Sequence, residues 1–212
     1  MRAKFITFEG GEGAGKSTQL RLLADRLRHL DISVEVTREP GGTPGAEAIR
    51  ELLVRGDAAR WTPMTEAFLH VAARVDHITR FIQPALNAGK WVLCDRFADS
   101  TVAYQGYGHG LDKSAIAQLN KMALSDVRPD LTLIFDIPVK EGLARSRKPS
   151  QLRGEDRYEK MDVGFHERIR EGFLEIAAQE PQRCRVINAT GSVEMVAEQI
   201  AAHIGSHFGI SL

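Results

Sequence analysis

The chain has 212 residues, of which 43% are hydrophobic and 26% are charged. This composition is typical of a globular protein, and we expect residues 1–212 to form one domain. The 28 basic and 28 acidic residues cancel. The balance argues against a general nucleic-acid-binding protein, because such proteins are usually strongly basic. It still permits a local basic pocket for a small anion.

No apolar run reaches the roughly 18 residues of a membrane span, so we expect no membrane partner. Residues 1–4 lead into a short apolar segment and then glycines, without the long apolar stretch of a signal peptide. We therefore expect a cytoplasmic protein. Cys94 and Cys184 are far apart in the sequence. We interpret them as small buried hydrophobic residues and not as a disulfide framework.

Short apolar runs alternate with longer helical patterns along the chain. We predict strands over residues 4–8, 33–37, 91–94, 131–135 and 185–187. We predict helices from about residue 16 to residue 30, and over about residues 44–54, 63–88, 113–124, 139–147, 161–179 and 193–207. Strands that alternate with helices indicate parallel βαβ units, so the sequence predicts an α/β fold with a sheet covered on both faces.

The segment 145–157 is polar and basic, and Pro149 and Gly154 interrupt it. This composition fits a solvated surface loop. It fits equally well a mobile lid that brings arginines onto a phosphate chain, since such lids close over many active sites.

A glycine-rich motif follows the first predicted strand. The residues that match G-x-x-x-x-G-K-[S/T] are Gly10, Gly11, Glu12, Gly13, Ala14, Gly15, Lys16 and Ser17. The glycines let successive backbone N–H groups point at one anion, and the following helix adds its N-terminal dipole. Lys16 supplies a positive charge for the β- and γ-phosphates, and Ser17 offers a hydroxyl to Mg²⁺. The motif therefore predicts a nucleoside triphosphate site.

The motif alone does not decide what happens to the γ-phosphate, and a regulatory GTPase or a motor-type ATPase is the first alternative. A guanine-binding protein usually carries Asn-Lys-x-Asp after a later strand. The segment 120–123, Asn-Lys-Met-Ala, lacks the aspartate and lies in a helical pattern, and no Asp-x-x-Gly switch follows a strand. These observations disfavour a GTPase.

Arg38 and Arg96 each follow a predicted strand. Ligands of an open parallel sheet bind beyond the carboxyl ends of its strands, so we expect both arginines in the crevice of the glycine-rich motif. A guanidinium group suits the oxygens of a terminal phosphate. The pair therefore predicts a second phosphorylated substrate in line with the triphosphate. We expect Asp95 either near Mg²⁺ or against Arg96.

Seven segments together resemble bacterial thymidylate kinases, a family of P-loop nucleoside monophosphate kinases. They are residues 8–18, 38–43, 72–74, 95–97, 103–106, 128–132 and 156–159. The resemblance implies that the γ-phosphoryl group of ATP is transferred to dTMP with Mg²⁺, giving dTDP and ADP. It also implies a homodimer and a P-loop NTPase-type fold. That fold has five parallel strands, helices on both faces, and a short lid at about residues 145–157.

The resemblance also implies roles for single residues. The loop residues through Thr18 would bind ATP. Glu12 would accept a hydrogen bond from the deoxyribose 3′-hydroxyl, while Arg38 and Arg96 would hold the dTMP phosphate. The residues implied near the phosphate, base and sugar of dTMP are Arg50, His70, Arg74, Thr101, Tyr104 and Gln105. Taken alone, each of these also reads as an ordinary structural or surface residue.

Two positions depart from the family pattern. Many relatives place phenylalanine under the thymine where this chain has His70, which would either stack as a neutral imidazole or face solvent. Some relatives carry an arginine where this chain has Gly13. We therefore expect the cation for the transferring phosphoryl group from the lid, and the candidates are Arg147, Arg153 and Arg157.

Two other functions stay open at this point. One is a kinase for another nucleoside monophosphate, and the other is a regulator that binds ATP only as a ligand.

Overall fold

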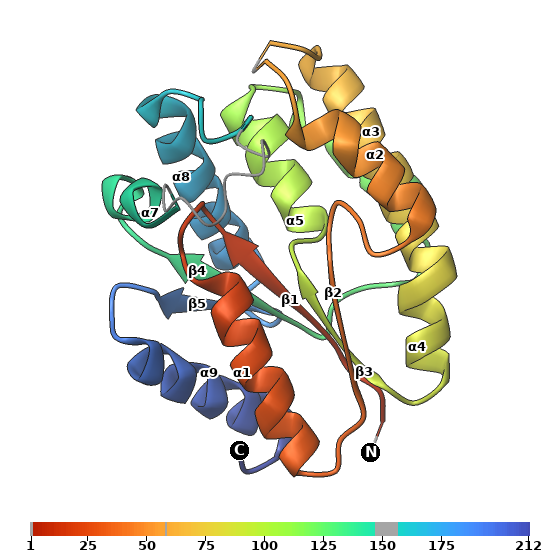
Figure 1. Cartoon of the computed structure of the whole chain (residues 1–212), viewed down its shortest axis with the longest axis vertical. Coiled ribbons are helices and arrows are strands. Elements are labelled where there is room, and N and C mark those ends of the chain that lie inside the picture. The colour runs from red at the N-terminus through yellow and green to blue at the C-terminus, as the bar shows by residue number, and fades with distance from the viewer. Residues whose placement is uncertain (1, 58, 147–156) are drawn as a thin grey trace.

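A computed structural model describes residues 2–57, 59–146 and 157–212 of the chain. Its centre is a parallel sheet with the strand order β2-β3-β1-β4-β5 (Figure 1). The strands are β1 (Phe5–Gly10), β2 (Val34–Arg38), β3 (Trp91–Asp95), β4 (Leu131–Asp136) and β5 (Cys184–Asn188). The predicted α/β fold and its five-stranded parallel sheet are confirmed.

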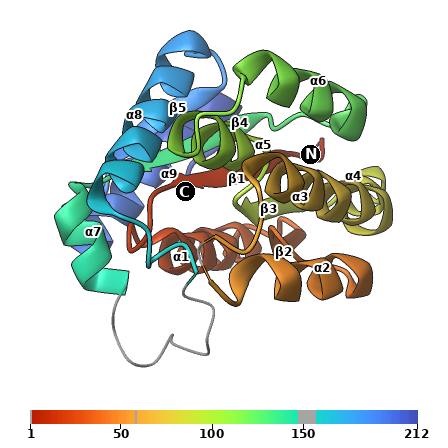
Figure 2. The ribbon, with the colours of Figure 1, turned by 90° about the horizontal axis from the view of Figure 1, so that it is seen from above.

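Helices cover both faces of the sheet, as Figure 2 shows from above. The helices on one face are α1 (Lys16–His29) and α9 (Val193–Phe208). The helices on the other face are α4 (Gln83–Asn87), α5 (Ala98–Thr101) and α8 (Val163–Gln179). Side chains alternate along a strand, so Ile6 and Phe8 pack toward α1 while Phe5 packs on the opposite face. Both faces of β1 are therefore buried.

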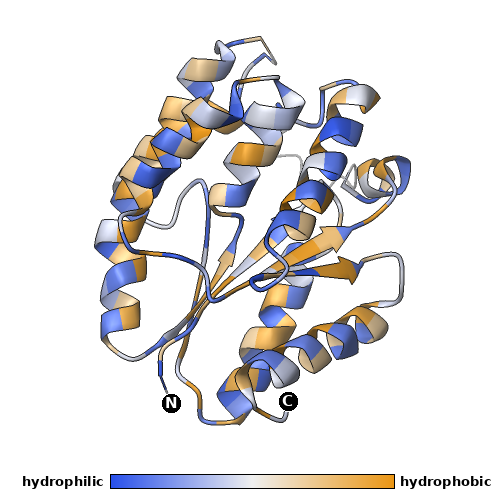
Figure 3. Ribbon diagram, turned by 180° about the vertical axis from the view of Figure 1, so that it is seen from behind, coloured by the Kyte–Doolittle hydropathy of each residue, from blue (hydrophilic) through white to orange (hydrophobic). Residues whose placement is uncertain are grey.

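The strands are largely hydrophobic and the helices are amphipathic, as the colouring of Figure 3 shows. This pattern is typical of a sheet between two helical layers. Cys94 in β3 and Cys184 in β5 are both free and buried, which confirms that they serve as small core residues.

The helix predicted over residues 63–88 is one continuous helical stretch with a wider segment inside it. It consists of α3 (Pro63–His77), the π-helical segment η1 (Ile78–Ile82) and α4. In η1 the Gln83 N–H donates to the carbonyl of Ile78, five residues earlier. The wider turn lies directly before Pro84, which has no N–H to donate to the carbonyl four residues before it.

One helical region was not predicted. After β3 the chain forms α5 and then the π-helical segment η2 (Val102–Gly108). Gly106 and Gly108 disfavour a helix in isolation. Tertiary packing overrides this preference, because a Cβ at Gly108 would lie 2.6 Å from the ring of Phe165 in α8. The close contact requires a glycine on a helix at this point.

The remaining helices agree with the prediction. They are α2 (Pro44–Val54), α6 (Lys113–Leu124) and α7 (Val139–Ser146). Thr43 caps α2 by accepting a hydrogen bond from the Ala46 N–H, and Pro44 occupies the first turn. In the part of the chain that the structure describes, no helix is both long and apolar enough to cross a membrane.

The glycine-rich loop, residues 10–17, packs directly on α7. A Cβ at Gly13 would lie 1.9 Å from the carbonyl oxygen of Gly142, and a Cβ at Gly142 would lie 2.5 Å from the carbonyl oxygen of Glu12. Gly13 also has a φ of 66°, which favours glycine. The arginine that some relatives carry at this position therefore has no room here.

We expect Gly142→Ala to lower the free energy of unfolding by about 1–3 kcal/mol, because the added methyl group forces α7 away from the loop. Chemical denaturation measures the change. Ala144→Ser, on the exposed side of α7, is the matched control and should change stability by less than about 0.5 kcal/mol. Equal stability of the two variants would contradict the close contact.

Candidate active site

The glycine-rich loop borders a pocket of about 370 Å³, which we call the loop pocket. Its walls are the loop, the start of α1, Asp95, Arg96, Arg145 and Glu159. Gly15 precedes α1 in a left-handed conformation, and no side chain caps the helix. The first N–H groups of α1 therefore point at the pocket without a side-chain partner, which is the usual arrangement of a phosphate site.

Lys16 curls back over the loop. Its Nζ donates to the carbonyl oxygens of Gly10 and Gly11 at 3.1 and 2.7 Å. Burial and the nearby charge of Arg96 lower the pKa of Lys16 to about 8. The ammonium group is therefore charged at neutral pH, although its charge is sensitive to moderately alkaline solution.

Ser17 and Asp95 form the oxygen-rich side of the loop pocket. The Ser17 hydroxyl donates to Oδ2 of Asp95 at 2.6 Å, and this contact joins α1 to the end of β3. Among the described residues no group of three or more His, Cys, Asp or Glu side chains could hold a metal ion. Two oxygen donors still fit Mg²⁺, which usually completes its shell with phosphate oxygens and water.

Arg96 joins the loop pocket to its neighbour. Its backbone has a φ of 67°, a strained value for a residue with a side chain. The guanidinium donates to the Gly10 carbonyl at 2.9 Å and to Oε1 of Glu12 at 3.0 Å. It also lies over the ring of Tyr104, 5.0 Å from the ring centroid.

Glu9 supports this strained turn, although the sequence analysis assigned it no role. Its buried carboxylate accepts hydrogen bonds from the Phe97 N–H at 2.8 Å and from the Ser100 hydroxyl at 2.6 Å. Burial and the nearby Asp99 raise the pKa of Glu9 to about 7. These two contacts hold the residues that follow Arg96 against β1.

Glu12 lies between the two pockets. Its Oε1 also accepts a hydrogen bond from the Tyr104 hydroxyl at 2.7 Å. Burial would raise its pKa, but the positive charges of Arg96 and Lys16 outweigh that effect and lower the pKa to about 2. Glu12 is therefore ionised at neutral pH and acts only as a hydrogen-bond acceptor.

The second pocket has a volume of about 130 Å³, and we call it the adjoining pocket. Glu12, Arg96 and Glu159 line both pockets, so the two are contiguous. The other predicted residues on its wall are Arg50, His70, Tyr104 and Gln105. A ligand in the adjoining pocket therefore has one end beside the glycine-rich loop.

His70 faces the adjoining pocket and not solvent. It lies within hydrogen-bond distance of Tyr158, with 2.9 Å between its Nε2 and the tyrosine hydroxyl. Burial lowers the pKa of His70 to about 4, so the ring is neutral at pH 7. Tyr158 also lines the pocket. Tyr158 belongs to the family-like segment 156–159, but the sequence predicts no role for it.

Arg38, Arg74 and Thr101 do not line the adjoining pocket. Arg38 is exposed and forms an ion pair with Glu47 at 3.1 Å. Arg74 is 1% exposed and forms an ion pair with Glu39 at 2.8 Å. Its guanidinium also donates to the Thr101 hydroxyl at 3.0 Å. The structure thus places Arg74 and Thr101 in a buried polar network beside the pocket.

The lid candidates fall into two groups. Arg147 and Arg153 lie outside the described residues. Arg157 is fully buried, forms an ion pair with Glu66 and donates to the carbonyl of Leu53 at 3.2 Å. Arg157 is therefore an anchor between α2 and α3 and not a cation at the loop pocket, which corrects its sequence-based assignment.

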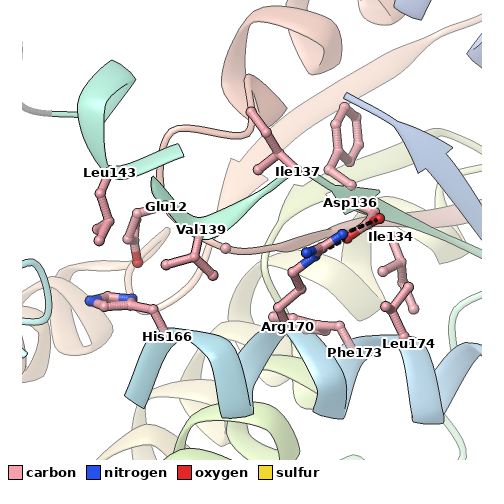
Figure 4. A pocket seen from close by; sticks show the side chains of 12 residues that line it. Glu12, Ile134, Asp136, Ile137, Val139, Leu143, His166, Arg170, Phe173 and Leu174 are labelled. Carbon is pink, nitrogen blue, oxygen red and sulfur yellow. Dashed lines mark hydrogen bonds and ion pairs between the residues drawn. The ribbon is translucent and has the colours of Figure 1, made fainter. Parts of the chain in front are cut away.

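A small pocket of about 20 Å³ lies behind Glu12, between α7, β4 and α8. Figure 4 shows Glu12 and His166 near one end of this pocket and the Arg170–Asp136 pair at the other. Arg170 holds both carboxylate oxygens of Asp136, at 2.6 and 3.0 Å. The pair ties α8 to the end of β4.

We expect binding of ATP without a second substrate to weaken above about pH 8, by up to tenfold per pH unit, because neutral Lys16 loses its attraction to phosphate. Calorimetric titration from pH 7 to 10 measures this dependence. Lys16→Arg keeps its charge over the whole range and should give a flatter profile. A wild-type affinity that does not change with pH would contradict the role of Lys16.

Known proteins are similar to this chain along nearly its whole length. Residues 8–200 match the family model described as thymidylate kinase. The thymidylate kinase of Caulobacter vibrioides is 54% identical over 206 residues, which are 97% of this chain and 98% of that protein. The thymidylate kinase of Rhizorhabdus wittichii is 50% identical over 200 residues, which are 94% of this chain and 96% of that protein.

A solved structure agrees with these relatives. The crystal structure of thymidylate kinase from Ehrlichia chaffeensis has a TM-score of 0.77 and 37% sequence identity to this chain. The match covers 96% of this chain and 99% of that one. The chain therefore belongs to the thymidylate kinase family.

Proposed function

We propose that this protein transfers the γ-phosphoryl group of ATP to dTMP, giving ADP and dTDP. The observation that carries the proposal is that the two pockets meet at one arginine and two carboxylates, Glu12 and Glu159. Arg96 and Glu12 line both the loop pocket and the adjoining pocket. A donor in one and an acceptor in the other would therefore meet beside the glycine-rich loop. The family membership supplies the identity of the two nucleotides.

The loop pocket would hold ATP. The N–H groups of the loop and of the first turn of α1 would bind the phosphates, and Lys16 would exchange its carbonyl partners for phosphate oxygens. Ser17 and Asp95 would hold Mg²⁺, which neutralises charge on the triphosphate. Arg147 and Arg153 remain candidates for the arginine at the transferring group.

The adjoining pocket would hold dTMP. Glu12 would accept a hydrogen bond from the 3′-hydroxyl, since it is an ionised acceptor. Tyr104 would pack against the sugar, and His70 would stack on the base. Arg96 would bind the phosphate, with Arg50 and Arg38 nearby. Arg38 would have to leave its exposed ion pair with Glu47 to do so, at little cost because such pairs are weak.

The reaction needs little proton transfer. A phosphate oxygen of dTMP would attack the γ-phosphorus in line, and the bond to the β–γ bridging oxygen would break, leaving ADP. The phosphate monoester is already largely ionised at neutral pH, so no strong general base is required. The chain's own residues would align the two nucleotides and neutralise charge on the oxygens in transfer.

The direct test is turnover with ATP and each of dTMP, dUMP, UMP, CMP, AMP and GMP in a coupled assay of ADP release. We expect dTMP to be the best acceptor. Arg96→Ala should lose at least about 100-fold in kcat, because an arginine at the transferring phosphate stabilises the transition state. Arg128→Ala is the control, since Arg128 donates to the carbonyls of Ser125 and Val127 and lines neither of the two pockets.

The panel also decides between the open alternatives. A different best acceptor would indicate a kinase for another monophosphate. ATP binding without any acceptor-dependent ADP release would indicate a regulator.

We further propose a homodimer formed through α3 and α6, which contact each other. Met64, Phe68 and Val75 lie along one exposed stripe of α3, and Phe68 is 55% exposed. Met122 of α6 is 80% exposed. An apolar surface of this kind is typical of a protein–protein interface.

Cytoplasmic localisation stays a prediction from the sequence.

We expect Phe68→Asp to convert the dimer to a monomer, because the carboxylate would be buried without a partner in the interface. Light scattering after size-exclusion chromatography measures the mass. Met195→Asp, at a residue 69% exposed on α9, should leave the mass unchanged. A wild-type protein that is monomeric at micromolar concentration would refute the dimer.

A further inference from the structure

Glu66 is a buried carboxylate that does not line either pocket of the active site. It lies in the first turn of α3. Its Oε1 accepts a hydrogen bond from Nε2 of Gln105 at 2.7 Å, and its Oε2 pairs with Arg157 at 2.5 Å. Nε2 of His109 lies 3.5 Å from Oε1. A carboxylate buried this deeply is costly and calls for a specific function.

The surroundings of Glu66 keep it ionised. Burial would raise its pKa, but contact with His109 and the positive charge of Arg157 outweigh that effect, and its pKa is lowered to about 2. An ionised carboxylate has no proton to donate and can only accept hydrogen bonds. Glu66 is therefore a fixed acceptor at neutral pH.

This acceptor determines which way the Gln105 amide points. The amide has a donor end, Nε2, and an acceptor end, Oε1, and only the donor end can face Glu66. The reversed amide would place two oxygen acceptors against each other. Oε1 of Gln105 is left buried, and it has no hydrogen-bond partner among the described residues. Gln105 lines the adjoining pocket, and because Glu66 holds its Nε2, we expect Oε1 to be its polar atom for a ligand.

We propose that Glu66 is a positioning residue that makes the adjoining pocket select pyrimidines whose ring nitrogen N3 carries a hydrogen. The inference rests on the proposed function, because it concerns the base of the acceptor nucleotide. Thymine and uracil carry N3–H, which can donate to Oε1 of Gln105. Cytosine has an unprotonated N3, an acceptor that would face another acceptor. Oε1 of Gln105 is buried without a hydrogen-bond partner among the described residues, and only a donor on the base offsets the cost of its burial. The preference for thymine or uracil over cytosine should therefore be strong.

A second consequence concerns the end of the predicted lid. Arg157 directly follows residues 147–156 and holds the other oxygen of Glu66. The same carboxylate thus fastens the chain after that segment and orients the amide in the pocket. These two contacts can be separated experimentally because they use different oxygens.

The test compares dTMP with 5-methyl-dCMP, which share the methyl group, sugar and phosphate and differ only at N3 and the 4-position. In the variant Glu66→Gln, residue 66 can present either an oxygen or an NH₂ group to Gln105, so the Gln105 amide can turn over. We expect the KM for dTMP to rise about tenfold with kcat changed by less than about threefold. We expect the kcat/KM ratio of dTMP to 5-methyl-dCMP to fall at least about tenfold.

Two further variants separate positioning from general structure. Gln105→Met keeps Glu66 and its pair with Arg157, and it should reduce the same substrate ratio. The double variant should match Gln105→Met alone, because Glu66 acts through that side chain. Arg157→Lys removes the bonds to the carbonyls of Leu53 and Asp57 but leaves the Glu66–Gln105 contact, so it should lower stability without changing the ratio.

The outcomes are distinguishable. No phosphorylation of dTMP by the wild type would refute the proposed function itself. Phosphorylation of dTMP with an unchanged substrate ratio in Glu66→Gln would refute only the role of Glu66. If Glu66→Gln does not fold, Gln105→Met decides, and a retained preference for dTMP there would overturn the inference.

Discussion

The left-handed turn at Arg96 is the constraint on which the active site depends. The Arg96 N–H donates to the carbonyl of Phe8, and the next N–H is held by Glu9, so the turn is fastened to β1 on both sides. The guanidinium can then reach the Gly10 carbonyl and Glu12. One side chain thereby fixes the glycine-rich loop relative to the adjoining pocket. Two ligands bound there would be aligned by a rigid part of the fold and not by a flexible loop.

The other contacts of the site follow from where neighbouring elements begin and end. The glycine pair at Gly13 and Gly142 brings α7 against the loop, and α7 leads into residues 147–156. The chain after that segment is anchored by Arg157 on Glu66. Ser146, which precedes the segment, lines the loop pocket, and Tyr158, which follows it, lines the adjoining pocket.

The sequence predicted the sheet, most helices and the phosphate loop, because each depends on a local pattern. The approximate bounds predicted for α2 and α6 agree with the structure. The helix after β3 was missed, because its glycines are favourable only in contact with α8. Side-chain partners were the least predictable. Arg38 and Arg74 were both expected at a ligand, yet each pairs with a carboxylate whose position depends on the tertiary fold.

The burial of both thiols has a consequence for the chemistry that the protein tolerates. The Sγ of Cys94 donates to the carbonyl of Arg96 at 3.0 Å, so a thiol lies next to the central turn of the active site. Burial and the neighbouring carboxylates raise its pKa well above the ordinary value, and burial raises the pKa of Cys184 to about 12. Alkylating agents and peroxide react with thiolates, which are scarce here. The two thiols of the folded protein should therefore react slowly with such reagents.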